Sequence, residues 1–110
     1  MSDDRMENDM SDLPFKNTYG LSQDQLQALD EAEEAMEVGR LNDAESLFLA
    51  MLKEDEDCVP VLANLGHLHG RHFSEYDKAV EYYDRVLLLE PDNAWARDER
   101  RKYKRWLDSD

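Results

Sequence analysis

The feature that most constrains how this chain can fold is a spacing of residue types that occurs twice. A large, a small, an aromatic and an aliphatic residue follow one another at intervals of three, four and three positions. The set returns after 35 residues: Leu41, Ala44, Phe48 and Met51 in the first copy, and Tyr76, Ala79, Tyr83 and Val86 in the second. Intervals of three and four place side chains on one face of an α-helix. The sequence therefore predicts an internal repeat of amphipathic helices.

Each repeated helix is preceded by another predicted helix. Ser22 and Gln25 have the spacing of a capping box and predict the start of the first of these, and Gly39 predicts its end in a left-handed turn. In the second copy, Pro60 suits the first turn of the preceding helix. That helix contains Gly66 on its apolar face, where the missing side chain allows another backbone to come close.

Asn42 and Ser74 are expected to cap the two repeated helices, and Pro91 is expected to end the second one.

A chain of 110 residues forms at most one domain, and its pattern predicts no strand. The expected fold class is all-α, with about five helices in tandem antiparallel pairs, as in an α-solenoid. Residues 1–20 are acidic and poor in apolar side chains, so we expect them to be a disordered tail. Residues 21–108 are expected to form the helical domain, with repeat one at 25–58, repeat two at 59–93 and a capping helix at 94–107.

Charge narrows the classes of function. The formal net charge of -14 disfavours binding to nucleic acid and to anionic membranes. No apolar run approaches the roughly 20 residues of a membrane span and no signal peptide is visible, so a soluble cytoplasmic protein is expected. Residues 21–58 hold 12 acidic and 2 basic residues, whereas residues 94–110 hold 4 acidic and 6 basic residues. Adaptation to a salt-rich cytoplasm would also explain the acidity, and that explanation stays open.

No pattern indicates an enzyme, a metal site or a cofactor. His67 and His69 point roughly 200° apart on a helix, so only His69 and His72 lie on one side, and no further ligand completes a zinc site. Cys58 is the single cysteine and is expected to be a small packing residue. Carboxylates are abundant without a distinct acid/base pair, and the chain has no glycine-rich phosphate loop. A non-catalytic protein is therefore expected.

The paired helices resemble the tetratricopeptide repeat family, whose 34-residue unit is a helix pair. The matching residues are clearest in the second unit: Leu62, Leu65, Gly66, His69, Tyr76, Ala79, Tyr83, Val86 and Pro91. His69 stands where the family usually has an aromatic residue, and one extra residue lies near Phe73. The first unit departs from the pattern at more positions, namely Ala28, Glu31, Ala32, Ala35 and Glu56. The resemblance covers about residues 22–107.

The last helix differs from a third repeat. The helix before Phe73 has Leu62, Leu65, Gly66 and His69 on one face. The residues 35 positions after these four are all basic, namely Arg97, Arg100, Arg101 and Lys104. The array is therefore expected to end there with a solvating helix, which packs back through Ala96, Tyr103 and Leu107.

The resemblance also implies a binding groove, because family members bind peptides or helices along the first helices of their pairs. Carried over by position, the lining is Leu29, Asp30, Glu33, Glu37, Asn64, His67, Arg71, Trp95, Asp98 and Glu99. Members that capture chaperone C-terminal carboxylates use a clamp of Lys, Asn, Asn, Lys and Arg, of which only Asn64 is present here. Acidic residues in place of these cations favour a basic or neutral partner segment. We therefore expect a protein-binding adaptor that is monomeric alone.

Two other functions stay open. The chain could be a structural subunit whose groove or capping helix is buried in a larger assembly. The basic last helix, with Trp95, Tyr103 and Trp106 between its cations, also resembles a nucleic-acid-binding surface, although the charge of the whole chain opposes that function.

Overall fold

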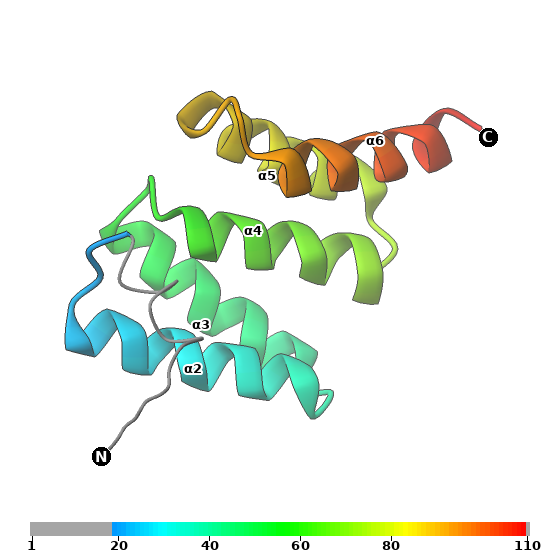
Figure 1. The fold of residues 1–110 in the computed structure, drawn as a ribbon. Helices are drawn as coiled ribbons and strands as arrows, with labels where there is room; N and C mark the ends of the chain where they lie inside the picture. Colours follow the sequence, from blue (N-terminus) through cyan, green and yellow to red (C-terminus); the bar gives the residue numbers. More distant parts are fainter. Residues whose placement is uncertain (1–18, 110) are drawn as a thin grey trace, which may run out of the picture.

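The structure, a computed structural model, describes residues 19–109, which fold into five α-helices without a strand (Figure 1). The helices are α2 Gln23–Glu37, α3 Leu41–Glu54, α4 Val59–His67, α5 Tyr76–Leu89 and α6 Ala94–Asp108. The prediction of an all-α fold of tandem helix pairs is confirmed. The predicted tail lies outside the described residues except for Tyr19 and Gly20. No helix among residues 19–109 combines the length and the apolar composition needed to cross a membrane.

Successive helices pack on one another in chain order and form a stack. In Figure 1, α2 and α3 lie at the lower end of this stack, α4 in the middle, and α5 and α6 at the upper end. On one side, the Asn64 amide of α4 donates to Glu33 of α2, and Gly70 lies against Tyr103 of α6. On the other side, α3 and α5 together line a hollow that includes Leu49. Helices α2, α4 and α6 therefore share one face of the stack.

Several helix ends form as the sequence predicts. The Ser22 hydroxyl accepts a hydrogen bond from the Gln25 amide at 3.1 Å, and the Gln25 side chain accepts one from the Ser22 amide at 2.9 Å, which completes the capping box. Gly39 has a φ of 89°, so it ends α2 in the left-handed region. Pro60 lies in the first turn of α4.

The two other predicted caps are wrong. Helix α3 begins at Leu41 without a side-chain cap, because the chain enters it directly from the turn at Gly39, and Asn42 already lies inside it. Helix α5 begins after Glu75, while Ser74 has a φ of 56°. The reason is a π-helical turn at Leu68–His72, closed by a hydrogen bond from the Phe73 amide to the Leu68 carbonyl at 3.1 Å. This turn takes up the extra residue of the second unit, and Ser74 then reverses the chain.

The repeated small and aromatic positions form the core. Ala44, Phe48, Ala79 and Tyr83 have no exposed surface, which confirms the buried face that the spacing predicts. In α6, Ala96 and Tyr103 are buried as expected. Leu107 is 39% exposed, so its predicted packing is wrong. Trp106 lies three residues after Tyr103 and contacts Tyr76 at 5.5 Å between ring centroids in its place.

Two glycines allow close contact between α4 and the helices after it. A Cβ atom at Gly66 would lie 2.8 Å from the Tyr83 ring, and one at Gly70 would lie 2.5 Å from the Tyr103 ring. Both distances are too short for packed carbon atoms. The tyrosine rings therefore occupy the space of the missing side chains.

We expect Gly70→Ala to lower the free energy of unfolding by roughly 1 to 3 kcal/mol, because the new methyl group displaces the Tyr103 ring. Thermal or urea unfolding followed by circular dichroism measures the change. Tyr103→Leu supplies the control: combined with Gly70→Ala it should cost less than the two single changes added together. Strictly additive effects would show that the two residues do not compete for space.

Candidate functional site

The residues predicted to bind a partner lie on α2, on α6, and on α4 with its π-helical extension; we call this surface the α2/α4/α6 face. One of these predictions is wrong. Leu29 is only 2% exposed and belongs to the core. It lies on the same stripe of α2 as the buried Ala32 and Met36, at intervals of three and four residues, so it cannot line a binding surface.

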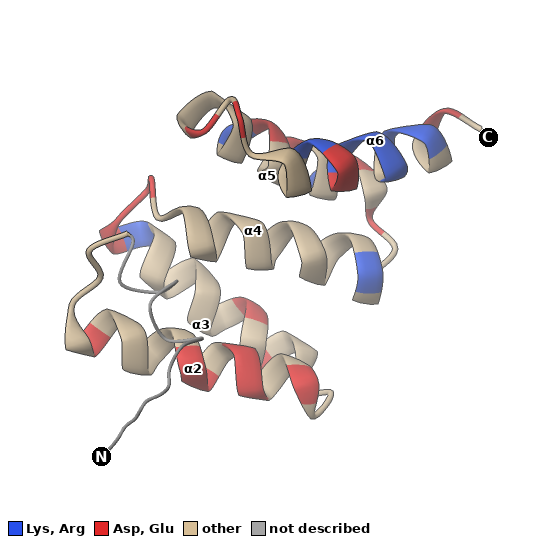
Figure 2. Ribbon diagram, in the orientation of Figure 1, with Lys and Arg blue, Asp and Glu red and all other residues tan. Residues whose placement is uncertain are grey.

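Carboxylates dominate the α2 part of this face. Asp30, Glu33 and Glu37 follow one another at intervals of three and four residues, so they form a row along one side of the helix. Asp30 and Glu37 are exposed, and Glu33 is half-buried. Glu37 makes no ion pair within residues 19–109, and Figure 2 shows the acidic residues gathered on α2. Like charges at this spacing repel one another, so the binding of a cationic group beside them is favourable.

Asn64 connects the acidic row to α4. Its side-chain amide donates to the Glu33 carboxylate at 3.0 Å and to the Pro60 carbonyl at 2.9 Å. Both amide hydrogens are therefore used inside the chain. The Asn64 amide is therefore not available to a partner backbone, and it holds Glu33 in place instead.

The α6 part of the face contains mixed charges and one large aromatic ring. Trp95 is 49% exposed, and its ring meets the edge of the buried Tyr83 ring at 5.6 Å between centroids. Asp98 pairs with Arg101 at 3.6 Å, and Glu99 pairs with Lys102 at 3.2 Å. These carboxylates are already balanced by cations of the same helix. On this face, Glu37 of α2 is a carboxylate without an ion pair within residues 19–109.

His67 lies between α4 and α6. Burial lowers the pKa of His67, and the neighbouring His72, Arg71 and Lys102 lower it further, whereas the Glu99 carboxylate opposes these effects. The His67 and His72 rings meet edge to face at 5.6 Å between centroids. His67 is thus a neutral, half-buried side chain at neutral pH, and it reports on how close α6 lies to α4.

The titration of His67 tests this arrangement. Glu99→Gln removes a charge that favours the protonated ring and should lower the pKa of His67 further, whereas Lys102→Gln removes an opposing charge and should raise it. The ring-proton chemical shifts of His67, followed by NMR as a function of pH, measure both changes. Shifts of the same sign in the two variants would contradict the placement of α6.

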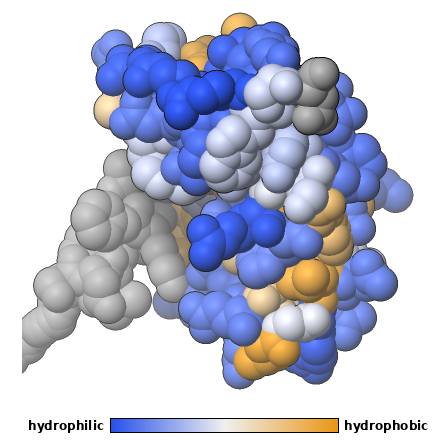
Figure 3. Space-filling view, turned by 90° about the vertical axis from the view of Figure 1, so that its right-hand side faces the viewer, coloured by the Kyte–Doolittle hydropathy of each residue, from blue (hydrophilic) through white to orange (hydrophobic). Residues whose placement is uncertain are grey.

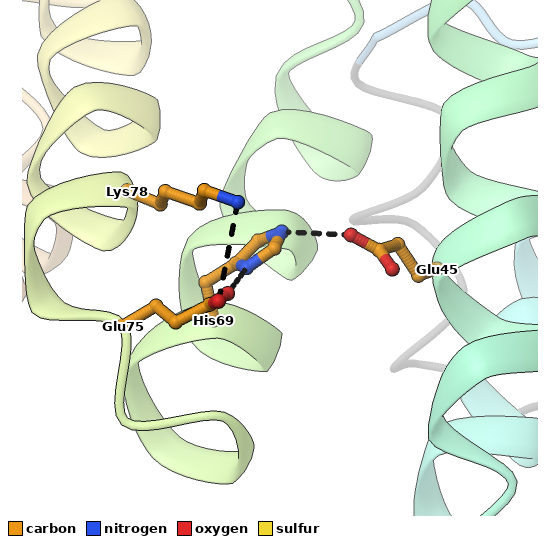
Figure 4. A network of polar contacts seen from close by, with 4 residues as sticks. All are labelled: Glu45, His69, Glu75 and Lys78. Carbon is orange, nitrogen blue, oxygen red and sulfur yellow. Dashed lines mark hydrogen bonds and ion pairs between the residues drawn. The ribbon is translucent and has the colours of Figure 1, made fainter.

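The structure also shows a polar cluster that sequence reasoning missed (Figure 4). His69 is only 2% exposed, and its Nδ1 lies 2.7 Å from Glu75 Oε1 while its Nε2 lies 3.3 Å from Glu45 Oε2. Each ring nitrogen therefore lies close to the carboxylate of a different residue. Lys78 Nζ lies 3.9 Å from the second oxygen of Glu75. The cluster therefore joins α3 to the π-helical turn and to the start of α5.

Aromatic rings enclose the same histidine. The His69 ring stacks on Tyr82 at 5.6 Å between centroids and meets the edge of Phe73 at 5.4 Å. The one signal for this cluster in the sequence was a histidine at a position where the family usually has an aromatic residue. The contact with Glu45 could not be identified, because Glu45 lies 24 positions before His69 in the chain.

We expect His69→Ala to lower the free energy of unfolding by about 2 to 4 kcal/mol, since it leaves a cavity and removes the contacts of the ring with Glu45 and Glu75. The exposed His72 provides the control, and His72→Ala should change stability by less than about 0.5 kcal/mol. Denaturant unfolding of both variants measures the difference. Equal effects would show that His69 has no special structural role.

Metal binding and thiol chemistry find little support in the described part of the chain. Within residues 19–109, no three His, Cys, Asp or Glu side chains are arranged to hold a metal ion. Cys58 is buried, and burial raises the pKa of its thiol, with Asp55 adding to the effect and a backbone hydrogen bond at Val61 opposing it. A thiol that keeps its proton is a poor nucleophile.

Comparison with known proteins does not assign the chain to a group: no family model matches it, and no curated protein is significantly similar to it.

Proposed function

We propose that this protein is a non-catalytic adaptor of the tetratricopeptide type that binds a basic or neutral segment of another protein on the α2/α4/α6 face, with the cytoplasm as its compartment. The stack of helix pairs and the twice-repeated spacing of core residues support this class. The proposal does not depend on a cofactor or a reacting side chain.

The observation that carries the proposal is the acidic row of α2. Asp30, Glu33 and Glu37 present their carboxylates along one side of the helix, and Asn64 fixes the middle one. A rigid row of like charges attracts a segment with cations at matching intervals, and it increases the rate of association more than it slows dissociation. Trp95, at the other end of the face, offers an exposed ring for an apolar or cationic side chain of the same segment.

Two synthetic peptides of equal length test the proposal, one alternating lysine with leucine and the other alternating glutamate with leucine. We expect the lysine peptide to shift backbone amide signals of α2 near Glu33 and Glu37 in NMR spectra, and the glutamate peptide to leave them unchanged. Glu33→Gln with Glu37→Gln should weaken binding of the lysine peptide roughly fivefold to tenfold at low salt and less at high salt. Glutamine retains the hydrogen bond from Asn64, so the variant changes charge and leaves the helix contact intact.

Arg97→Gln with Arg105→Gln is the matched control, because it also neutralises two charges, on exposed residues of α6. This variant should bind the lysine peptide with an affinity within about twofold of that of the natural chain. If the α2 variant keeps its affinity while the α6 variant loses it, partner binding does not occur at the acidic row.

A further inference from the structure

The lower end of the stack has a face with an apolar floor that no other part of residues 19–109 covers, and we call it the N-end face. Two adjoining hollows between α2 and α3 share Leu47. Their other apolar lining residues are Ala28, Ala35, Ala50 and Met51. All the residues that line these hollows lie before α4, and Glu45, on the other side of α3, points to His69. The N-end face therefore points away from the rest of the stack.

Acidic residues surround this apolar floor. Asp24, Glu54 and Asp55 line one hollow, and Asp43 lines the other beside the single cation Arg40. Glu31 is exposed and lies on the same side of α2, three residues after Ala28. Figure 3 views the stack from its side, where hydrophobic side chains are visible at the level of α2 and α3 and the upper part is mostly hydrophilic.

The upper end of the stack has a face of opposite charge, which the rest of the described chain likewise leaves uncovered; we call it the C-end face. A hollow between α5 and α6 is lined by Leu87, two acidic residues and five basic ones, namely Arg97, Arg100, Arg101, Lys104 and Arg105. Three of the cations have intramolecular partners: Arg100 pairs with Asp84, Arg101 with Asp98 and Lys104 with Asp108. Arg97 and Arg105 make no ion pair within residues 19–109. Figure 2 shows the basic residues along α6.

We infer that these two faces bind each other between copies of the chain, with the C-end face of one molecule docked on the N-end face of the next. The charges are complementary: Arg97 and Arg105, which have no ion pair within the described residues, would meet Glu54, which lines the N-end face, and the exposed Glu31 on the same side of α2. Each face also offers an apolar centre, Leu87 at one end and Leu47 at the other. Stacked helix pairs bury such faces against a neighbouring pair, and a second copy supplies that neighbour.

The size of the faces sets the strength of this contact. The fifteen residues of α2 and of α6 make each helix about 22 Å long, and two packed helices are about 20 Å wide. Each face therefore covers roughly 450 Å², and a complete contact buries roughly 900 Å² in total, which is below the range of stable complexes. The dilute chain is then monomeric, and association is expected only at high protein concentration. Because the two faces differ, the contact is head-to-tail. A dimer formed in this way still has one free face at each end, so further copies can bind.

Sedimentation velocity over a range of protein concentrations tests the inference. The sedimentation coefficient of the natural chain should rise with concentration. Arg97→Glu with Arg105→Glu makes the C-end face acidic, and Glu31→Lys with Glu54→Lys makes the N-end face basic, so each variant alone should show no rise. In an equimolar mixture of the two variants, the acidic C-end face of one variant can bind the basic N-end face of the other. The sedimentation coefficient of the mixture should therefore rise with concentration again. Both variants keep a strongly negative net charge and repel each other overall, so attraction between net charges cannot explain a rise in the sedimentation coefficient of the mixture.

All four substituted residues are exposed, and circular dichroism verifies that both variants keep their helices. The variant Glu33→Gln with Glu37→Gln, on the α2/α4/α6 face, should associate like the natural chain, which separates this contact from the proposed partner site. The inference is overturned if the natural chain shows no rise at any concentration. It is also overturned if either face variant associates as the natural chain does, or if the mixture shows no gain.

Discussion

The close contact of two glycines with two tyrosine rings is the constraint on which the upper half of the stack depends. Gly66 receives the Tyr83 ring and Gly70 the Tyr103 ring, and these rings stack on each other at 6.1 Å between centroids. Because Tyr103 belongs to α6, the same contacts fix the α6 part of the candidate binding face. The Tyr83 hydroxyl has no hydrogen-bond partner among the described residues, and burial raises its pKa, so it stays neutral. The unsatisfied hydroxyl costs about 1 to 3 kcal/mol, which burial of the ring offsets.

The contact between the two repeats combines the packing of α3 on α4 with a polar side chain, His69. The π-helical turn at Leu68–His72 brings His69 between Glu45 and Glu75, so one extra residue in the chain changes both the helix geometry and the partners of the ring. The two carboxylates are only partly buried and keep contact with water, which limits the cost of enclosing charge. The aromatic neighbours Phe73 and Tyr82, which belong to the second repeat like His69, enclose the ring.

Periodicity predicted the fold well, because helix faces and most helix ends are local properties of the sequence. The spacing around Ala79 and Tyr83 predicted the core, and Ser22, Gly39 and Pro60 marked helix boundaries. The candidate site could be predicted less fully, since its details depend on contacts between distant residues. Family positions alone placed both Leu29 and Asn64 in the lining of the groove, whereas packing buries Leu29 and the Asn64 amide donates to Glu33. The π-helical turn and its effect on Ser74 likewise depend on tertiary packing.

The two proposed contacts use different sides of the same helix and do not exclude each other. Glu33 lies in the row that would receive a basic partner segment, and Glu31 lies at the rim of the N-end face. Two residues apart on an α-helix, these side chains point about 200° away from each other. A partner segment on the α2/α4/α6 face therefore leaves the N-end face open to a second copy. In a head-to-tail row of copies, the partner-binding face would recur once per molecule, so that weak sites act together on a partner with several basic segments.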